Sequence, residues 1–209
     1  MAKRKHRAAA GFAGLMLAAG LTVVGMGTAS AAADHVRIDI EDDCDPATFN
    51  LPQPQGLGPG ACLEDGDTTL ASAFAQVAAT GRIVGWDMDP PKLSIRARQP
   101  LKVENDGGEE HTFSRVTAFG GGIVPPLNNP AKLPDTAKIA DGCLALVTTG
   151  PTATNFFLPS DEERRIPTGP GTSLTASTRP YLFQCCIHPC MRTAITINNR
   201  DGDNRGRDH

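Results

Sequence analysis

A short segment near the C-terminal end of the chain gathers three side chains that bind metal ions. Cys185, His188 and Met191 stand at three-residue intervals in the run CCIHPCM. Soft sulfur donors select copper, especially the cuprous ion, and imidazole supports both oxidation states. One thiolate and two imidazoles in a trigonal set, with a weak axial thioether, form the blue-copper arrangement. The segment holds one imidazole, so a second must come from elsewhere.

The strands that position these side chains indicate where the second imidazole lies. An alternating pattern over 179–185 predicts a strand that delivers Cys185, and another over 192–197 predicts a strand that leaves the segment. His111 opens a third alternating stretch over 111–118, directly after a polar loop. We therefore predict one mononuclear copper site with His111, Cys185, His188 and Met191 as ligands.

These segments resemble the cupredoxin family. His111-Thr112-Phe113 resembles the first-ligand motif of that family, and the Cys-x-x-His-x-x-Met spacing is similar to the short ligand loop of amicyanin. The resemblance covers residues 92–125 and 176–198. It implies a Greek-key sandwich with copper as the cofactor. It also implies that Asn105 ties the two ligand-bearing loops together, while the alternative for Asn105 is a turn before Asp106-Gly107.

The rest of the chain supplies further elements of this all-β, cupredoxin-like antiparallel sandwich. Alternation or β-type residues predict strands at 35–40, 82–88, 93–96 and 101–104, the last two around a turn at 98–100, and make about seven strands in all. One helix is predicted over 68–79, capped by Asp67 or Thr68 and ended by Gly81. Its predicted apolar face is Leu70, Phe74, Val77 and Ala78.

The predicted domain spans 34–198 and carries two additions. One is a helix-containing extension over 43–90, and the other is a long loop insertion over 128–175, in which Ile139–Val147 is a short strand or a buried turn. Residues 120–127 (GGGIVPPL) form either an apolar docking face beside the copper end or a Pro/Gly-rich loop.

Six cysteines in an exported chain suggest disulfides. We predict a Cys44–Cys62 bridge that closes a loop rich in Pro, Gly and Asp. Cys143 is left to pair with Cys186 or with Cys190, and both pairings stay open. Alternation places Cys185 and Cys186 on opposite faces of their strand, so both do not easily bind one metal ion. The rival sites are a binuclear copper centre that uses Cys186 and Cys190 and a zinc site of Cys and His.

The two ends of the chain are predicted to lie outside the domain. Residues 1–33 begin with four basic residues, continue through an apolar stretch and end in small residues, which predicts a cleaved signal peptide and a secreted or periplasmic protein. The alternative is an uncleaved membrane anchor. After cleavage no membrane span is expected. The tail over 199–209 is charged and is predicted to be disordered.

The charge of the mature chain limits its partners. Subtracting the four basic residues of 1–33 from 20 leaves 16 basic against 23 acidic residues, a net charge of about −7. Nucleic acid is therefore excluded as a partner, since phosphate binding needs clustered positive charge. A monomer with a protein redox partner is expected.

Three functions are compatible with the predicted site. The first is one-electron transfer, with the exposed edge of His188 as the exit for the electron. The second is copper handling as a carrier, scavenger or sensor module. The third is a metal-free structural domain, against which the four matching ligand types argue. No open coordination position or general base is evident, so an enzyme is not predicted.

Overall fold

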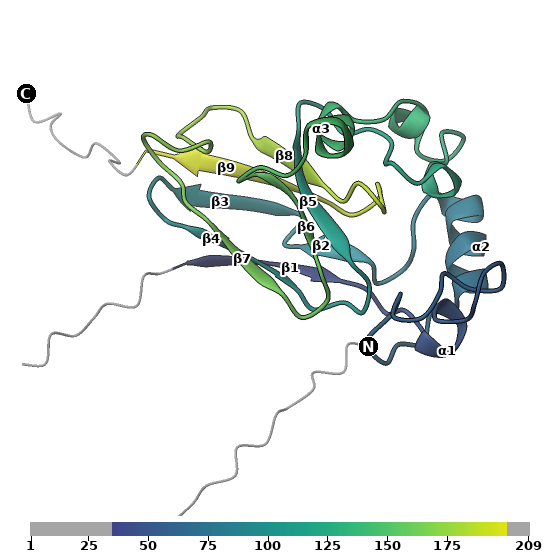
Figure 1. The fold of residues 1–209 in the computed structure, drawn as a ribbon. Helices are drawn as coiled ribbons and strands as arrows, with labels where there is room; N and C mark the ends of the chain where they lie inside the picture. Colours follow the sequence, from purple (N-terminus) through teal and green to yellow (C-terminus); the bar gives the residue numbers. More distant parts are fainter. Residues whose placement is uncertain (1–34, 200–209) are drawn as a thin grey trace, which may run out of the picture. The chain divides into compact units, whose positions relative to one another are not determined.

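The computed structural model describes residues 35–199, which form a sandwich of two β-sheets (Figure 1). The four-stranded sheet has the order β2-β1-β4-β7, and the five-stranded sheet has the order β3-β9-β8-β5-β6. The first sheet consists of β1 (Val36–Glu41), β2 (Asp87–Asp89), β4 (Leu101–Asn105) and β7 (Glu163–Ile166). The second consists of β3 (Lys92–Arg96), β5 (His111–Val116), β6 (Asn155–Leu158), β8 (Tyr181–Gln184) and β9 (Arg192–Asn198). The predicted cupredoxin-like sandwich is confirmed.

Two strand pairs differ from the predicted antiparallel arrangement. β1 pairs with β4, and β3 pairs with β9, in parallel, while every other ladder between named strands in 35–199 is antiparallel. Alternation along a strand reports which face is buried, but it carries no information about the direction of the neighbouring strand.

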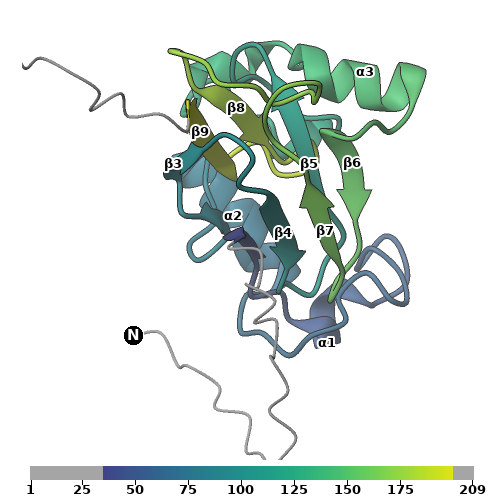
Figure 2. The same cartoon turned by 90° about the vertical axis from the view of Figure 1, so that its left-hand side faces the viewer.

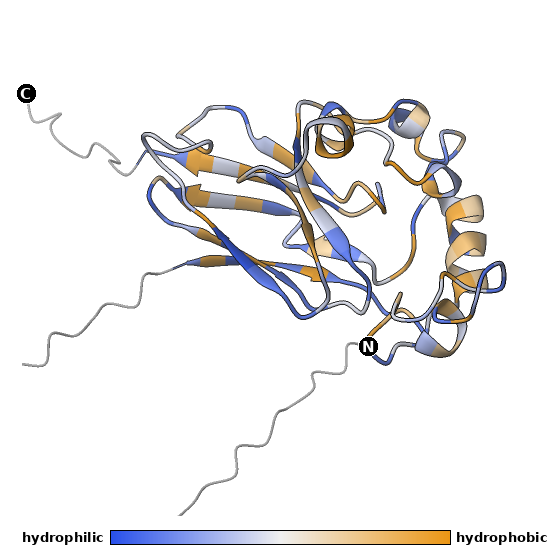
Figure 3. Cartoon of the chain, in the orientation of Figure 1, coloured by the Kyte–Doolittle hydropathy of each residue, from blue (hydrophilic) through white to orange (hydrophobic). Residues whose placement is uncertain are grey.

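The alternation that predicted the strands builds the core between the sheets. In β9 the buried positions are Thr193, Ile195 and Ile197, and the side chains between them are only partly buried. Figure 3 shows the same alternation as a change of colour along the strands. Phe113 of β5 stacks on Phe183 of β8 with ring centroids 4.2 Å apart. This aromatic pair stabilises the pairing of β5 with β8 next to the candidate site.

The predicted strands at 93–96 and 101–104 are present but do not pair with each other. β3 lies in the five-stranded sheet and β4 in the four-stranded sheet, so the turn between them carries the chain from one sheet to the other. Arg98 in this turn has a φ of 70°, in the left-handed region. Of the strand predicted over 82–88, only the last two residues lie in a strand, because β2 spans Asp87–Asp89.

Two helices lie at the end of the sandwich that carries the candidate site (Figure 1). They are α1 (Pro46–Phe49) and α2 (Leu70–Thr80). The helix predicted over 68–79 is confirmed, although Thr69 is the cap that accepts a hydrogen bond from Ser72 N. Gly81 ends it in the left-handed conformation, as predicted, with φ 77°. Its predicted apolar face is only partly right, because Ala73 and Val77 are buried while Phe74 is 38% exposed.

Residues 128–175 are not one long loop. They contain a 3₁₀ turn, η2 (Pro134–Ala137), the helix α3 (Asp141–Thr149), and the strands β6 and β7. The prediction of a strand or buried turn over 139–147 was wrong. Cys143 and Leu146 are buried at the helical spacing of three, and α3 packs beside β5 and β6 (Figure 2).

The close approach of α3 to the sheet depends on Gly142. A Cβ atom at this position would lie 2.0 Å from the carbonyl oxygen of Arg115 in β5, so only glycine fits there.

No helix within residues 35–199 is long and apolar enough to cross a membrane. The predicted signal peptide and the predicted tail fall outside the described residues, apart from residue 199.

Candidate metal centre

The two ligand-bearing segments meet at one end of the five-stranded sheet. β5 and β8 are antiparallel neighbours, with Ser114 opposite Gln184. The start of β5 and the end of β8 therefore lie at the same edge. His111 is the first residue of β5, and Cys185 directly follows β8. Sheet pairing thus brings together side chains that are 74 positions apart in the chain.

Three of the four predicted ligands converge on one point. Cys185 Sγ lies 3.6 Å from His111 Nδ1 and 3.9 Å from His188 Nδ1, and the two Nδ1 atoms are 3.3 Å apart. All three side chains are buried. Within residues 35–199 they form the one group of three or more His, Cys, Asp or Glu side chains that is positioned to hold a metal ion.

The size of this triangle fits a single metal ion. With bonds of about 2.0 Å to nitrogen and 2.3 Å to sulfur, a trigonal centre separates its nitrogens by about 3.5 Å and nitrogen from sulfur by about 3.7 Å. The three distances above agree with these values within a few tenths of an ångström. The donor set of one thiolate and two imidazoles fits copper.

The fourth predicted ligand, Met191, is fully buried in the core. Its carbonyl oxygen accepts a hydrogen bond from Cys185 N at 3.0 Å, and its own N–H donates to the carbonyl of His188 at 3.0 Å. These bonds fold residues 185–191 into a compact turn. The role of the Met191 thioether as an axial ligand stays a prediction.

A buried carboxylate holds the outer nitrogen of His111. Asp42 follows β1, and its Oδ2 atom lies 2.8 Å from His111 Nε2, with both side chains fully buried. Asp42 also accepts hydrogen bonds from the N–H groups of Cys44 and Glu109. This network fixes the ring so that its Nδ1 atom faces Cys185.

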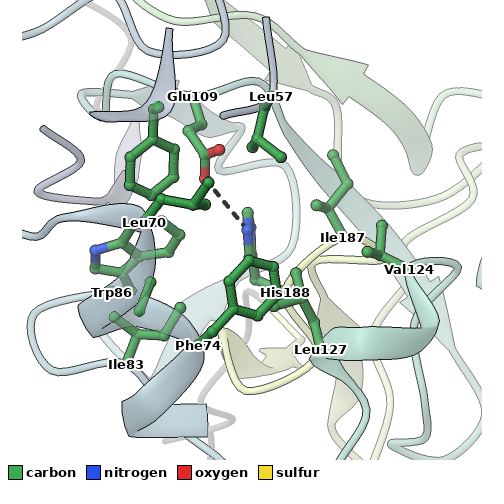
Figure 4. A pocket seen from close by; sticks show the side chains of 12 residues that line it. Leu57, Leu70, Phe74, Ile83, Trp86, Glu109, Val124, Leu127, Ile187 and His188 are labelled. Carbon is green, nitrogen blue, oxygen red and sulfur yellow. Dashed lines mark ion pairs between the residues drawn. The ribbon is translucent and has the colours of Figure 1, made fainter. Parts of the chain in front are cut away.

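A second carboxylate lies beside the outer nitrogen of His188. Glu109 Oε2 is 3.2 Å from His188 Nε2, an ion-pair distance without hydrogen-bond alignment (Figure 4). Both imidazoles therefore point one nitrogen at the metal position and the other at a carboxylate. Such partners raise the basicity of a metal-binding imidazole.

These contacts change the proton affinities of the cluster. Burial disfavours the charged form of His111, but its hydrogen bonds to Asp42 and Cys185 outweigh burial and raise its pKa to about 10. Burial likewise opposes the Cys185 thiolate, yet the two histidines lower the pKa of Cys185 well below its usual range. The pKa of His188 is raised against the effect of burial by Cys185 and Glu109. In the metal-free site these shifts favour a Cys185 thiolate beside a protonated His111.

Backbone N–H groups hold the sulfur of Cys185 in place. Thr112 N and His188 N each donate to Cys185 Sγ at 3.4 Å. The Thr112 hydroxyl also accepts a hydrogen bond from Cys186 N at 2.6 Å. Thr112 therefore ties the loop of His111 to the loop of Cys185.

The tying role predicted for Asn105 was wrong. Its amide donates to the carbonyls of Glu109 and Leu158, and its Oδ1 accepts from Gly107 N. The bond from Gly107 N to Asn105 Oδ1 forms the turn that the alternative interpretation held, and the bond to Leu158 also links this turn to β6. It makes no hydrogen bond to residues 185–191 in the described chain.

The cysteine pairing left open by the sequence is decided by α3. Cys143 is bonded to Cys186, and Cys44 is bonded to Cys62 as predicted. Cys185 and Cys190 are the free, buried cysteines. With Cys186 in a disulfide, the binuclear alternative is overturned, because it needs the thiolates of both Cys186 and Cys190.

The predicted exposed edge of His188 was wrong. The residue is 4% exposed, and Trp86 meets its ring edge-on with centroids 4.8 Å apart. Trp86 comes from the segment between α2 and β2, which sequence patterns assigned to a strand. The extension over 43–90 thus covers the site.

Sequence reasoning missed Asp42, Trp86, Glu109 and Thr112. Asp42 stood at the end of a predicted strand, and Glu109 and Thr112 flanked the predicted ligand His111. A polar residue next to a ligand-bearing strand end was the available signal.

No protein-family model matches the chain, and no curated protein matches it by sequence. The solved structures to which it is similar include a purple cupredoxin from Nitrosopumilus maritimus, with 9% identity, a TM-score of 0.33, and coverage of 78% of this chain and 99% of that one. An oxidised variant of amicyanin has 10% identity, a TM-score of 0.34, and coverage of 81% and 88%. Auracyanin A, a "blue" copper protein from Chloroflexus aurantiacus, has 16% identity, a TM-score of 0.31, and coverage of 54% and 89%.

These similar structures are cupredoxins, the family whose motifs the sequence resembles. The identities and TM-scores are low. The chemistry of this chain therefore rests on the side chains of its own site.

Proposed function

We propose that the protein binds one copper ion in a type 1-like site and transfers single electrons in an exported compartment. The observation that carries this proposal is the triangle of Cys185 Sγ, His111 Nδ1 and His188 Nδ1, with sides between 3.3 and 3.9 Å. Bound copper supplies a one-electron couple at this position.

The residues of the chain perform three tasks in this function. Cys185, His111 and His188 hold the ion, and Met191 is the proposed axial ligand. Asp42 and Glu109 orient the imidazoles from outside. The N–H groups of Thr112 and His188 would keep the sulfur in place when the ion is bound. A fixed ligand set needs little reorganisation when the charge of the ion changes.

The burial of the site favours electron transfer over copper carriage. The proposed ligands His111, Cys185 and His188 are at most 4% exposed. The helix α2 lies at this end of the sandwich (Figure 1), and Trp86 packs edge-on against His188. A carrier has to release its ion to a recipient, whereas electrons reach a buried ion without opening the protein. We propose a protein redox partner that meets this end of the sandwich, where Leu57 and Phe74 are exposed.

Export is proposed from the sequence of residues 1–33 and is supported by the two disulfides, since disulfides persist in oxidising compartments. A secreted or periplasmic location follows. Fractionation of the producing cells, with the N-terminus of the mature protein determined, tests this part of the proposal.

The visible and paramagnetic resonance spectra of the copper-loaded protein test the metal centre. We expect an intense thiolate-to-copper band in the oxidised protein, its reversible loss on one-electron reduction, and its absence in Cys185→Ser. The matched control is Cys190→Ser, which removes the other buried free thiol and should keep the band. A Cys185→Ser variant with unchanged colour and copper affinity would overturn the proposal, as would preferential binding of zinc.

A further inference from the structure

A cavity lies on the outer side of His188, opposite the metal position. Its volume is about 180 Å³, and Figure 4 shows the side chains that surround it. Its walls come from α2, from the segments before and after α2, and from the loops at 120–127 and 185–191. The lining side chains include Leu70, Phe74, Trp86, Val124, Leu127 and Ile187. Seven of the twelve lining residues belong to the extension over 43–90, and the other five belong to the loops around the candidate metal centre.

The chemistry of the cavity is almost entirely apolar. Among its lining residues, Glu109 and His188 are the ones with ionisable side chains. His188 Nε2 is directed at Glu109, and Trp86 Nε1 is a buried donor without a hydrogen-bond partner. The side-chain acceptor of the lining is the Glu109 carboxylate. The Glu109 side chain is 8% exposed, and its Oε2 atom is buried without a hydrogen-bond partner. The neighbouring His188 Nε2 is not aligned for a hydrogen bond to this oxygen. A ligand that donates a hydrogen bond to Glu109 would therefore gain affinity.

The size of the cavity limits its occupant. An engineered apolar cavity of about 150 Å³ accommodates benzene. A cavity of about 180 Å³ therefore accommodates one aromatic ring with one or two further heavy atoms. The lining side chains Leu57 and Phe74 are partly exposed, so a substituted fused ring system or a lipid chain of ordinary length would extend out of the cavity.

We propose that this cavity beside His188 binds a small, uncharged, single-ring aromatic molecule that carries one hydrogen-bond donor, as in a phenol. The ring lies among the apolar side chains, and the hydroxyl donates to the Glu109 carboxylate. An anionic ring such as benzoate is excluded because its charge would face Glu109 in a poorly hydrated space. The proposal does not depend on bound metal, since the cavity and Glu109 are formed by the chain itself.

Binding of phenol and of two matched probes tests the proposal, on the metal-free and on the copper-loaded protein. Calorimetry or ligand-observed NMR measures the affinities. Emission of Trp86, the single tryptophan of the chain, gives a second signal when it is excited where phenol does not absorb. We expect a dissociation constant for phenol on the order of 1 mM. Toluene, which has the same shape without the donor, should bind about 10-fold more weakly, and benzoate should not bind.

Two variants locate the binding. Val124→Phe places a ring in the cavity and should reduce phenol affinity at least tenfold, while the copper band stays unchanged. The matched control is Val84→Phe, at a side chain that is 82% exposed and does not line the cavity; it should bind phenol normally. Glu109→Gln in the metal-free protein should reduce the preference for phenol over toluene.

The outcomes separate this inference from the proposed function. Equal binding of phenol and toluene, or unchanged phenol binding in Val124→Phe, would overturn the inference and leave the copper site untouched. A protein that binds phenol as expected but shows no thiolate-to-copper band would keep the inference and overturn the proposed function. The inference would also be overturned if phenol did not bind and an apolar side chain of a partner protein occupied the cavity at Val124.

Discussion

The Oδ2 atom of Asp42 lies 2.8 Å from the Nε2 atom of His111, and neither side chain is exposed to solvent. Asp42 reaches this position from the end of β1, in the sheet opposite the one that carries His111. The two sheets of the sandwich are therefore linked through an imidazole of the candidate metal centre. The fixed orientation of the ring depends on a residue outside both ligand-bearing segments.

Asp42→Asn is expected to weaken metal binding by about 10- to 100-fold. The amide keeps the shape of the carboxylate but does not raise the basicity of the imidazole. Competition with a chelator of known affinity for cuprous copper measures the change. Asp65→Asn makes the same substitution at an exposed position and should leave the affinity unaltered. An Asp42→Asn protein with wild-type affinity would show that the hydrogen bond has no part in ligand orientation.

Metal uptake is expected to release protons at neutral pH. In the metal-free protein His111 is protonated on both nitrogens, because its pKa is raised to about 10, while Cys185 is already a thiolate because its pKa is lowered. A metal ion at His111 Nδ1 must displace that proton, and His188, whose pKa is also raised, contributes a further fraction. Affinity should therefore fall as the pH is lowered from about 9 to 6, by roughly one to two decades per pH unit.

Titration with zinc in weakly buffered solution, followed with a pH indicator, counts these protons without a change of oxidation state. We expect between one and two protons per ion. A pH-independent affinity over this range would mean that the histidines are neutral before metal binding. Release of three protons would mean that Cys185 is a thiol.

Thr112→Val is expected to lower the free energy of unfolding by about 1–3 kcal/mol. The substitution keeps the volume of the side chain but removes the oxygen that accepts the hydrogen bond from Cys186 N. The backbone N–H of residue 112 still donates to Cys185 Sγ, so metal affinity should fall less than tenfold. Denaturant unfolding of the metal-free protein measures the stability. Thr178→Val, at an exposed position, should change the free energy of unfolding little. Equal effects of the two substitutions would contradict a stabilising role of the hydrogen bond between Cys186 N and the Thr112 hydroxyl.

The Cys143–Cys186 disulfide is expected to stabilise the fold by about 4 kcal/mol, from the closure of a 43-residue loop. The double variant Cys143→Ala and Cys186→Ala should lose this amount in denaturant unfolding under oxidising conditions. Cys190→Ala removes a buried free cysteine of the same segment and should cost no loop closure. A loss in the double variant no larger than that in Cys190→Ala would argue against the disulfide in solution.

The local features of this protein could be predicted from the order of its residues. Cys185, His188 and Met191 lie within one segment of seven residues. This candidate ligand motif could therefore be recognised without information about distant parts of the chain. Alternation identified the strands that carry His111 and Cys185, and Gly81 identified the end of α2. The short segment between Cys44 and Cys62 predicted their bond. Each of these features depends on periodicity or on residue types that are near one another in the chain.

The residues that surround the site from distant parts of the chain became evident from the folded structure. Asp42 meets His111 across 69 positions, and Cys143 reaches Cys186 because 139–147 is a helix packed on the sheet rather than a strand. Trp86 and α2 cover His188, which local patterns had placed at the surface. Periodicity reports which face of an element is buried, whereas the identity of the neighbour depends on the route of the whole chain. The convergence of His111, Cys185 and His188 was therefore predictable, whereas the carboxylates, the covering helix and the cavity were not.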